Sequence, residues 1–269
     1  MKKGLNTQGF TIVEVMIVLA VTGALLIMAL VLISGQQGKT QFSQSINDIQ
    51  AQINDVVNNV ATGYYANNGN VSCTSTGGVP QPTVGAAGEG QNTGCVFLGR
   101  AIQFDVGGDK TAYNIYDIVG TQKTASGNYP ANKVEAAPVV LAPPSSTADT
   151  TSKLNLLYGL EVGSMKYQGG DISSIAFLSS FANYTNNDLN SGSQHVSLYP
   201  IKTSATIASG GETAPSAVPK ITAANMDDPG NGVQICFNSQ VGNQSGTITI
   251  GGNGGQLATT LKIQNTNCT

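Results

Sequence analysis

The sequence has few of the side chains on which most enzymes depend. Only 10% of its 269 residues are charged, tryptophan is absent, and there is a single histidine, His195. No serine lies in the G-x-S-x-G pattern of a nucleophile elbow, and neither H-E-x-x-H nor a P-loop is present. A histidine without these companions is typical of a surface or a strand edge. The sequence therefore predicts a protein that is not an enzyme and uses no cofactor.

The charge balance argues against a second broad class, the proteins that coat nucleic acid. Basic residues number 12 and acidic residues 15, and the lysines and arginines do not cluster. If Lys2 and Lys3 were removed with a leader, the net charge would change from −3 to −5. An acidic body of this kind repels a phosphate backbone. Wholesale coating of nucleic acid is therefore not expected.

The four cysteines favour disulfides over a zinc site. None lies in a C-x-x-C pair. An even number of cysteines behind a membrane-targeting start indicates an oxidising compartment. Three pairings are open. The sequential one is favoured because each bond closes a short loop, with a stabilisation of roughly 3 kcal/mol in the chain-entropy model. It joins Cys73 to Cys95 and Cys236 to Cys268.

Residues 15–33 form an apolar run broken only by Thr22 and Gly23. As a helix this run spans about 28 Å, close to the thickness of the hydrocarbon core of a bilayer. It is longer than the apolar part of a signal peptide, and no A-x-A cleavage site follows. Because Lys2 and Lys3 precede it, we expect the N-terminus in the cytoplasm and everything after Lys39 on the other side.

Glu14 lies where this apolar run begins, and a carboxylate in a membrane is costly. One explanation is local: Thr11 and Glu14 fit a capping box, in which each satisfies a backbone N–H of the other at a helix start. A plain membrane anchor gives no further reason for the charge. A partner cation is the expected remedy.

The residues around Glu14 resemble the class III leader junction of type IV pilins and type II secretion pseudopilins, and the likeness extends over residues 1 to about 65. That family has a short basic leader ending in glycine, then usually phenylalanine, then a glutamate at the fifth mature position within an apolar helix. The matching residues are Lys2-Lys3 and Gly9-Phe10-Thr11-Ile12-Val13-Glu14-Val15.

The resemblance implies that a prepilin peptidase cuts after Gly9 and that Phe10 becomes an N-methylated terminus. The new ammonium would then pair with Glu14 of an adjacent subunit, with Thr11 beside it. At about 4 Å and an effective dielectric of about 20, the attraction is on the order of 4 kcal/mol before desolvation. Glu14 is therefore predicted to set the register of assembly. An assembly ATPase and a platform protein are the further partners implied.

Beyond the membrane segment, apolar residues recur at spacings of three and four, which is typical of an amphipathic helix. We predict one helix over about 11–65, loosened near Gly35 and Gly38 and packed by its outer half on a globular head. A coiled-coil seam with another protein is the alternative. The apolar positions are Phe42, Ile46, Ile49, Ile53, Val56, Val57, Val60 and Tyr64.

The rest of the chain is predicted to be an antiparallel β-rich head, so the fold class is α+β and pilin-like. Residues 74–94 and 203–230 are read as loops, and 142–152 as a loop or sub-lobe boundary. The expected strands are Val96–Val106, Tyr113–Val119, Leu156–Val162, Ile172–Phe181, Val196–Ile201, Val233–Phe237, Thr247–Ile250 and Leu257–Ile263. The predicted regions are a leader (1–9), a transmembrane helix (10–34), an amphipathic helix (35–66) and a head (67–269). The head is loosely similar to those of H-type pseudopilins and FimT-like minor pilins.

Two acidic turns are weak calcium candidates, Asp105 with Asp109 and Asp227 with Asp228. Neither has EF-hand spacing, and a solvated Asx turn is the favoured interpretation. No metal site is therefore predicted.

The sequence as a whole predicts a filament subunit of a type IV pilus or pseudopilus. It would wait as a single-pass precursor in the cytoplasmic membrane and end in an extracellular pilus or a periplasmic pseudopilus. Adhesion, twitching motility, DNA uptake and secretion are the functions open to it. The alternatives are a monomeric, surface-anchored binding protein that never polymerises and, least favoured, an anchored hydrolase.

Overall fold

The computed structural model describes residues 11–63, 71–84, 94–106, 108–141, 152–179, 196–202, 223–227, 232–240, 243–251 and 257–268. The chain divides into two compact units, Met1–Gln41 and Phe42–Thr269. Helix α1, Ile12–Thr62, begins in the first unit and ends in the second.

In the first unit, α1 exposes its apolar side chains. Each large apolar side chain between Ile12 and Val31 is about half exposed or more. No residue in the most apolar stretch of the helix is buried. By length and composition this part of α1 can cross a membrane, a test that signal sequences also pass. Such exposed apolar surface is costly in water, and it fits insertion of this segment into a membrane. The helix continues through Gly35 and Gly38.

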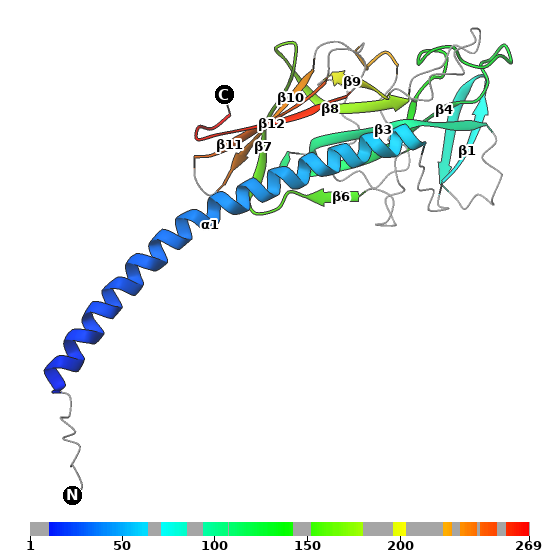
Figure 1. The fold of residues 1–269 in the computed structure, drawn as a ribbon. Coiled ribbons are helices and arrows are strands. Elements are labelled where there is room, and N and C mark those ends of the chain that lie inside the picture. The colour runs from blue at the N-terminus through cyan, green and yellow to red at the C-terminus, as the bar shows by residue number, and fades with distance from the viewer. Residues whose placement is uncertain are drawn as a thin grey trace, which may run out of the picture. The chain divides into compact units, whose positions relative to one another are not determined.

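In the second unit, the predicted stripe of α1 is buried against the head. Phe42, Ile46, Ile49, Ile53, Val56 and Val60 are each at most 2% exposed, and Val57 is partly buried. They share a core cluster with residues of the sheet, including Ile102 and Phe104 of strand β3 (Cys95–Val106), which lies beside α1 in Figure 1. The stripe therefore packs on the head of its own chain and is not a free coiled-coil seam. Tyr64 lies outside the described residues.

The head is built on antiparallel strands. Within the described residues ten strands form one sheet in the order β12-β11-β10-β7-β8-β3-β4-β5, with β6 added beside β4 and β9 beside β8. A separate two-stranded sheet joins β1 to β2. The bounds are β1 Val71–Thr76, β2 Val79–Val84, β3 Cys95–Val106, β4 Asp109–Thr121, β5 Val139–Leu141, β6 Ser152–Asn155, β7 Leu160–Tyr167, β8 Gly170–Ser179, β9 Val196–Lys202, β10 Val233–Ser239, β11 Ser245–Ile250 and β12 Thr259–Gln264.

The α+β class and the antiparallel head are confirmed, and each of the eight predicted strands overlaps a real one. The predicted strand Leu156–Val162 starts too early in the sequence, because β7 begins only at Leu160. Residues 157–159 precede it in a turn that the N–H of Leu160 closes on the carbonyl of Leu157. Reading residues 74–94 as loop was wrong for 79–84, which form β2, and for 74–76, which complete β1. The strands β5 and β6 were missed.

The other two predicted loops, 203–230 and 142–152, lie largely outside the described residues. Of 203–230, residues 223–227 form a turn in which Met226 makes an isolated bridge to Ile201. Residues 142–151 lie outside the described residues, and the strands on either side, β5 and β6, both pair with β4. The sub-lobe boundary near 142–152 stays a prediction.

Alternating side chains of the central strands supply two separate cores. Ile102 and Phe104 of β3 pack in the cluster that contains the buried stripe of α1. Ala101, next to Ile102 in the chain, packs with Tyr116 and Ile118 of β4 in a second cluster. Alternation with period two places successive side chains on opposite faces of a sheet, so the central strands are covered on both.

The close packing of α1 on the sheet requires a glycine at position 246 of β11. A Cβ there would lie 2.0 Å from Cδ1 of Ile46 and 3.6 Å from Cζ of Phe42. Ile46 is fully buried, so it has no solvent-filled space into which to move.

We expect Gly246→Ala to destabilise the head by about 1–3 kcal/mol through overpacking. Ile46→Val removes the clashing methyl at a cost of about 1 kcal/mol, so the double variant should lose less than the sum of the two. Denaturant unfolding of all three proteins measures this coupling. Ile53→Val, an equally buried position on the same stripe, serves as the control and should add independently. Strict additivity for Ile46 would contradict the packing described.

Candidate functional site

Helix α1 begins with a reciprocal pair of hydrogen bonds between Thr11 and Glu14. The backbone N–H of Glu14 donates to Thr11 Oγ1 (3.3 Å), and the backbone N–H of Thr11 donates to Glu14 Oε2 (3.4 Å). The Thr11 hydroxyl also lies 3.4 Å from Glu14 Oε2. Val15 N–H then makes the first helical bond, to Thr11 O (3.2 Å). The capping box expected from the sequence is therefore present.

The surroundings of Glu14 are exposed and apolar. Its neighbours Ile12, Val13 and Met16 are 80%, 65% and 68% exposed. Among the described residues Glu14 forms no ion pair, and the only cation of α1 is Lys39, about seven turns away along the helix. Within the described residues, one copy thus provides the carboxylate with hydrogen bonds but with no counter-ion. Gly9 and Phe10, the expected cleavage and methylation residues, lie outside the described residues.

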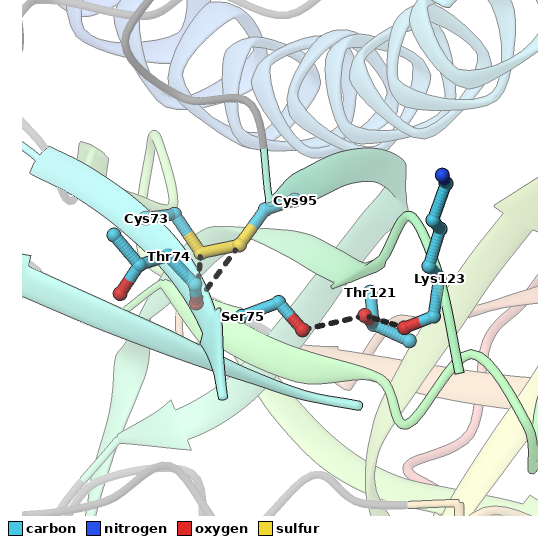
Figure 2. Close-up of a disulfide and its surroundings, with 6 residues drawn as sticks. All are labelled: Cys73, Thr74, Ser75, Cys95, Thr121 and Lys123. Atoms are coloured by element: carbon cyan, nitrogen blue, oxygen red, sulfur yellow. Dashed lines mark hydrogen bonds between the residues drawn. A yellow bond between two sulfur atoms is a disulfide. The ribbon is translucent and has the colours of Figure 1, made fainter. Parts of the chain in front are cut away.

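Two disulfides tie the head together, in the sequential pairing favoured from the sequence. Cys73–Cys95 joins β1 to the start of β3, and Figure 2 shows both sulfurs beside the carbonyl of Thr74. Cys236–Cys268 joins β10 to the segment after β12, where the N–H of Cys268 donates to Asn238 Oδ1 (2.8 Å).

The first disulfide fastens the two-stranded hairpin to the large sheet. A two-stranded sheet by itself is marginal in water. The hairpin β1–β2 meets the large sheet through the small cluster of Cys73, Cys95 and Val119 and through Ser75 Oγ, 2.7 Å from Thr121 Oγ1. The Thr121 hydroxyl in turn donates to the carbonyl of Lys123 (2.6 Å), as Figure 2 shows. These contacts hold β1 against β3 and β4 of the large sheet.

The calcium candidates are not brought together into a larger set of ligands. Asp109 accepts hydrogen bonds from the N–H and the hydroxyl of Thr111 (3.0 and 2.6 Å), which is an Asx turn. Asp105 is exposed, and Asp227 lies 3.2 Å from Lys202 Nζ. Among the described residues no three potential metal ligands gather. Asp228 and His195 lie outside the described residues.

A half-buried ion pair on the central strands was not anticipated from the sequence. Arg100 of β3 and Asp117 of β4 are directly opposite in register, with Nε 2.8 Å from Oδ1. Their side chains are 13% and 23% exposed. Burial raises the pKa of the Asp117 carboxyl above its ordinary value, and the Arg100 guanidinium offsets part of that rise. Only the strand register brings the two together.

We expect Arg100→Met to cost about 3 kcal/mol at neutral pH, because it leaves the Asp117 carboxylate buried without its cation. A raised pKa means that the folded state holds the proton more tightly than the unfolded chain, so the carboxylate's penalty shrinks on acidification. The variant should therefore regain stability relative to wild type as the pH falls. Urea unfolding at several pH values measures this. Combining it with Asp117→Leu should restore most of the loss at neutral pH.

The part of the chain that is similar to a known family lies near its N-terminus. Residues 5–30 match the family described as the prokaryotic N-terminal methylation motif. No curated protein and no solved structure matches the chain significantly. The resemblance of the head to H-type pseudopilins and FimT-like minor pilins is therefore unsupported.

The motif and the long apolar helix support one class of precursor. The chain carries a class III prepilin leader followed by a long apolar helix and an antiparallel β-rich head. This supports a precursor of the type IV pilin or pseudopilin kind, and it fits a membrane-anchored form. The motif also implies processing by a prepilin peptidase and the use of pilus assembly machinery in general, and it suggests a structural protein that is not an enzyme.

Proposed function

We propose that the chain is cut after Gly9, methylated at Phe10 and polymerised through α1 into a type IV pilus or pseudopilus. The observation that carries this proposal is the Glu14 carboxylate, which a prepilin motif contains at the start of an apolar helix that the described residues leave uncovered. Helix packing in a filament would replace lipid as the cover. The ammonium of Phe10 in the next subunit would supply the missing cation.

The filament would serve adhesion, twitching motility, DNA uptake or secretion, as an extracellular pilus or a periplasmic pseudopilus. An assembly ATPase and a platform protein would extract the subunit from the cytoplasmic membrane. The acidic chain favours an indirect part in DNA uptake.

One observation favours a second candidate, a monomeric anchored binding protein. The capping box satisfies Glu14 by hydrogen bonds within one copy, so the carboxylate has a use that needs no second subunit. In that case the leader is kept and the head works alone on the membrane surface.

Mass spectrometry of the mature N-terminus tests the proposal. We expect a chain that begins at methylated Phe10, with the first nine residues lost, and we expect sheared cell-surface or periplasmic filaments to contain it. Gly9→Val is the matched control and should keep Met1, because a bulky β-branched side chain cannot adopt the strained backbone that is open to glycine. Solitary wild-type molecules that retain Met1 would favour the anchored monomer.

A further inference from the structure

The turn between β6 and β7 holds a tyrosine in a backbone conformation that tyrosine disfavours. Tyr158 has φ +52° and Gly159 has φ +68°, and the N–H of Leu160 donates to the carbonyl of Leu157 (3.1 Å). Two central residues with positive φ are typical of a type I′ turn, where Asn-Gly is the preferred pair. A tyrosine at the first position costs on the order of 1 kcal/mol or more.

The turn is held rigidly from two sides. The Leu157 carbonyl also accepts a hydrogen bond from Ser45 Oγ of α1 (2.8 Å), and the Gly159 carbonyl accepts one from the N–H of Gln240 (2.8 Å). The side chain of Gln240 donates to Glu161 Oε1. The turn is therefore a fixed platform at the side of α1 and not a loose loop.

This platform displays apolar side chains to solvent. Leu157 and Tyr158 are 47% and 49% exposed. Among the large exposed apolar residues of the described head they are the only two that are consecutive; the others are Val79, Tyr129, Val134 and Ile263. A strained, clamped turn that exposes two such side chains is better explained by an interaction surface than by stability.

Charge indicates which partner fits. Glu161 stands two residues beyond Gly159 near the start of β7, and it forms no ion pair among the described residues. The only cation of α1 is Lys39, which is exposed and also without an ion pair in the described part of the chain. Six residues before Lys39, at Ile33, the apolar run of α1 ends. On a second copy, the apolar run that ends at Ile33 is followed by the cation Lys39. This order matches the exposed pair Leu157–Tyr158, which is followed by the anion Glu161.

We propose that the Leu157–Tyr158 turn docks on α1 of a second copy, where the apolar run ends, with Glu161 facing Lys39 of that copy. This inference rests on the proposed polymerisation and names a head-to-helix contact within it. The strain at Tyr158 is then the cost of presenting an aromatic side chain where a stability-optimised turn would have asparagine.

The decisive variant is Tyr158→Asn in the full-length chain, because it should separate stability from assembly. Asparagine suits positive φ, so the melting temperature in detergent should not fall and should rise by up to about 2–4 °C. Leader cleavage should be normal, whereas the yield of sheared filaments should drop by about tenfold, the effect of losing on the order of 1.4 kcal/mol at each contact. Tyr129→Asn, at another exposed tyrosine, is the matched control and should assemble normally.

A charge exchange and a cross-link identify the partner. Glu161→Lys and Lys39→Glu should each reduce filament yield, and the double variant should recover most of it, since the pair is restored in reverse. A photo-reactive phenylalanine at position 158 should cross-link to a second-copy peptide that contains Lys39. Three results would overturn this contact alone, provided that the wild-type chain forms filaments. They are full assembly of Tyr158→Asn, no recovery in the double variant, and cross-links to lipid or to another protein. A wild-type chain that is never cleaved and never polymerises would overturn the proposed function as well.

Discussion

Replacing Glu14 by leucine should abolish filament formation while leaving membrane insertion and leader cleavage intact. The variant makes α1 more apolar, so insertion is not impaired. In the proposed filament it would remove the carboxylate that pairs with the Phe10 ammonium of the next subunit. An attraction on the order of 4 kcal/mol before desolvation would then be lost at every step of the fibre, and the ammonium would be buried unpaired. The readouts are the N-terminal mass, the membrane fraction and the amount of sheared filament.

Two companion variants separate the pairing from the helix cap. Glu14→Gln keeps a capping-box side chain, because glutamine also fills this position, but it removes the charge. We expect it to fail in assembly almost as completely as leucine. Thr11→Ala loses the hydroxyl that accepts from the N–H of Glu14, at a cost of about 1 kcal/mol, and keeps the charge, so it should still assemble. The reverse outcome, with Gln assembling and Thr11→Ala failing, would show that Glu14 serves the helix start alone.

Gly99→Ala should destabilise the head by more than about 3 kcal/mol, a larger loss than a methyl group at Gly246 causes. Gly99 lies in β3 between β4 and β8, opposite Leu178 and next to an irregularity in the β3–β4 register. A Cβ there would lie 1.9 Å from the carbonyl oxygen of Phe177 and 2.9 Å from Cα of Leu178. Backbone atoms of a central strand cannot move aside as a side-chain tip can, so the sheet itself would have to open.

Gly108→Ala provides the matched control for that experiment. Gly108 has φ +88°, but no heavy atom lies within 4 Å of the position that an alanine Cβ would occupy, so the variant isolates the cost of backbone conformation. A loss of about 1–2 kcal/mol is expected there. Thermal unfolding of both full-length variants measures the difference. If Gly99→Ala unfolds no more easily than Gly108→Ala, the close approach of β3 to β8 is not as described.

The helix and its buried stripe were predictable because their information is local. Spacings of three and four from Phe42 to Val60 define one face whatever the rest of the chain does. Strands with clear alternation, such as Ile102 and Phe104 in β3, were found for the same reason. The hairpin β1–β2 was missed because Pro80 and Pro82 argue against a strand. They are tolerated because, in the part of the chain that the structure describes, β2 pairs only with β1, so no second neighbour needs their N–H groups.

What the sequence could not supply was the pairing of distant segments. The sheet places β10 beside β7 and β3 beside β8, and no local pattern encodes either choice. The pair Arg100 and Asp117 exists only once the β3–β4 register is set. The turn at Leu157 and Tyr158 was hidden for a different reason, because nothing in a tyrosine signals positive φ. By contrast the start of α1 was readable, since the leader motif and the capping box both lie within a few residues of Glu14.

The bond between Cys236 and Cys268 also bears on how the subunit is made. Cys268 follows β12 in the sequence, so this disulfide can form only after all the described strands of the sheet have been synthesised. A thiol pair of this kind stays reduced in the cytosol and oxidises on the far side of the membrane. The head would therefore be locked only after export, and cells lacking their thiol-oxidising catalyst should accumulate anchored, protease-sensitive subunits rather than fibres.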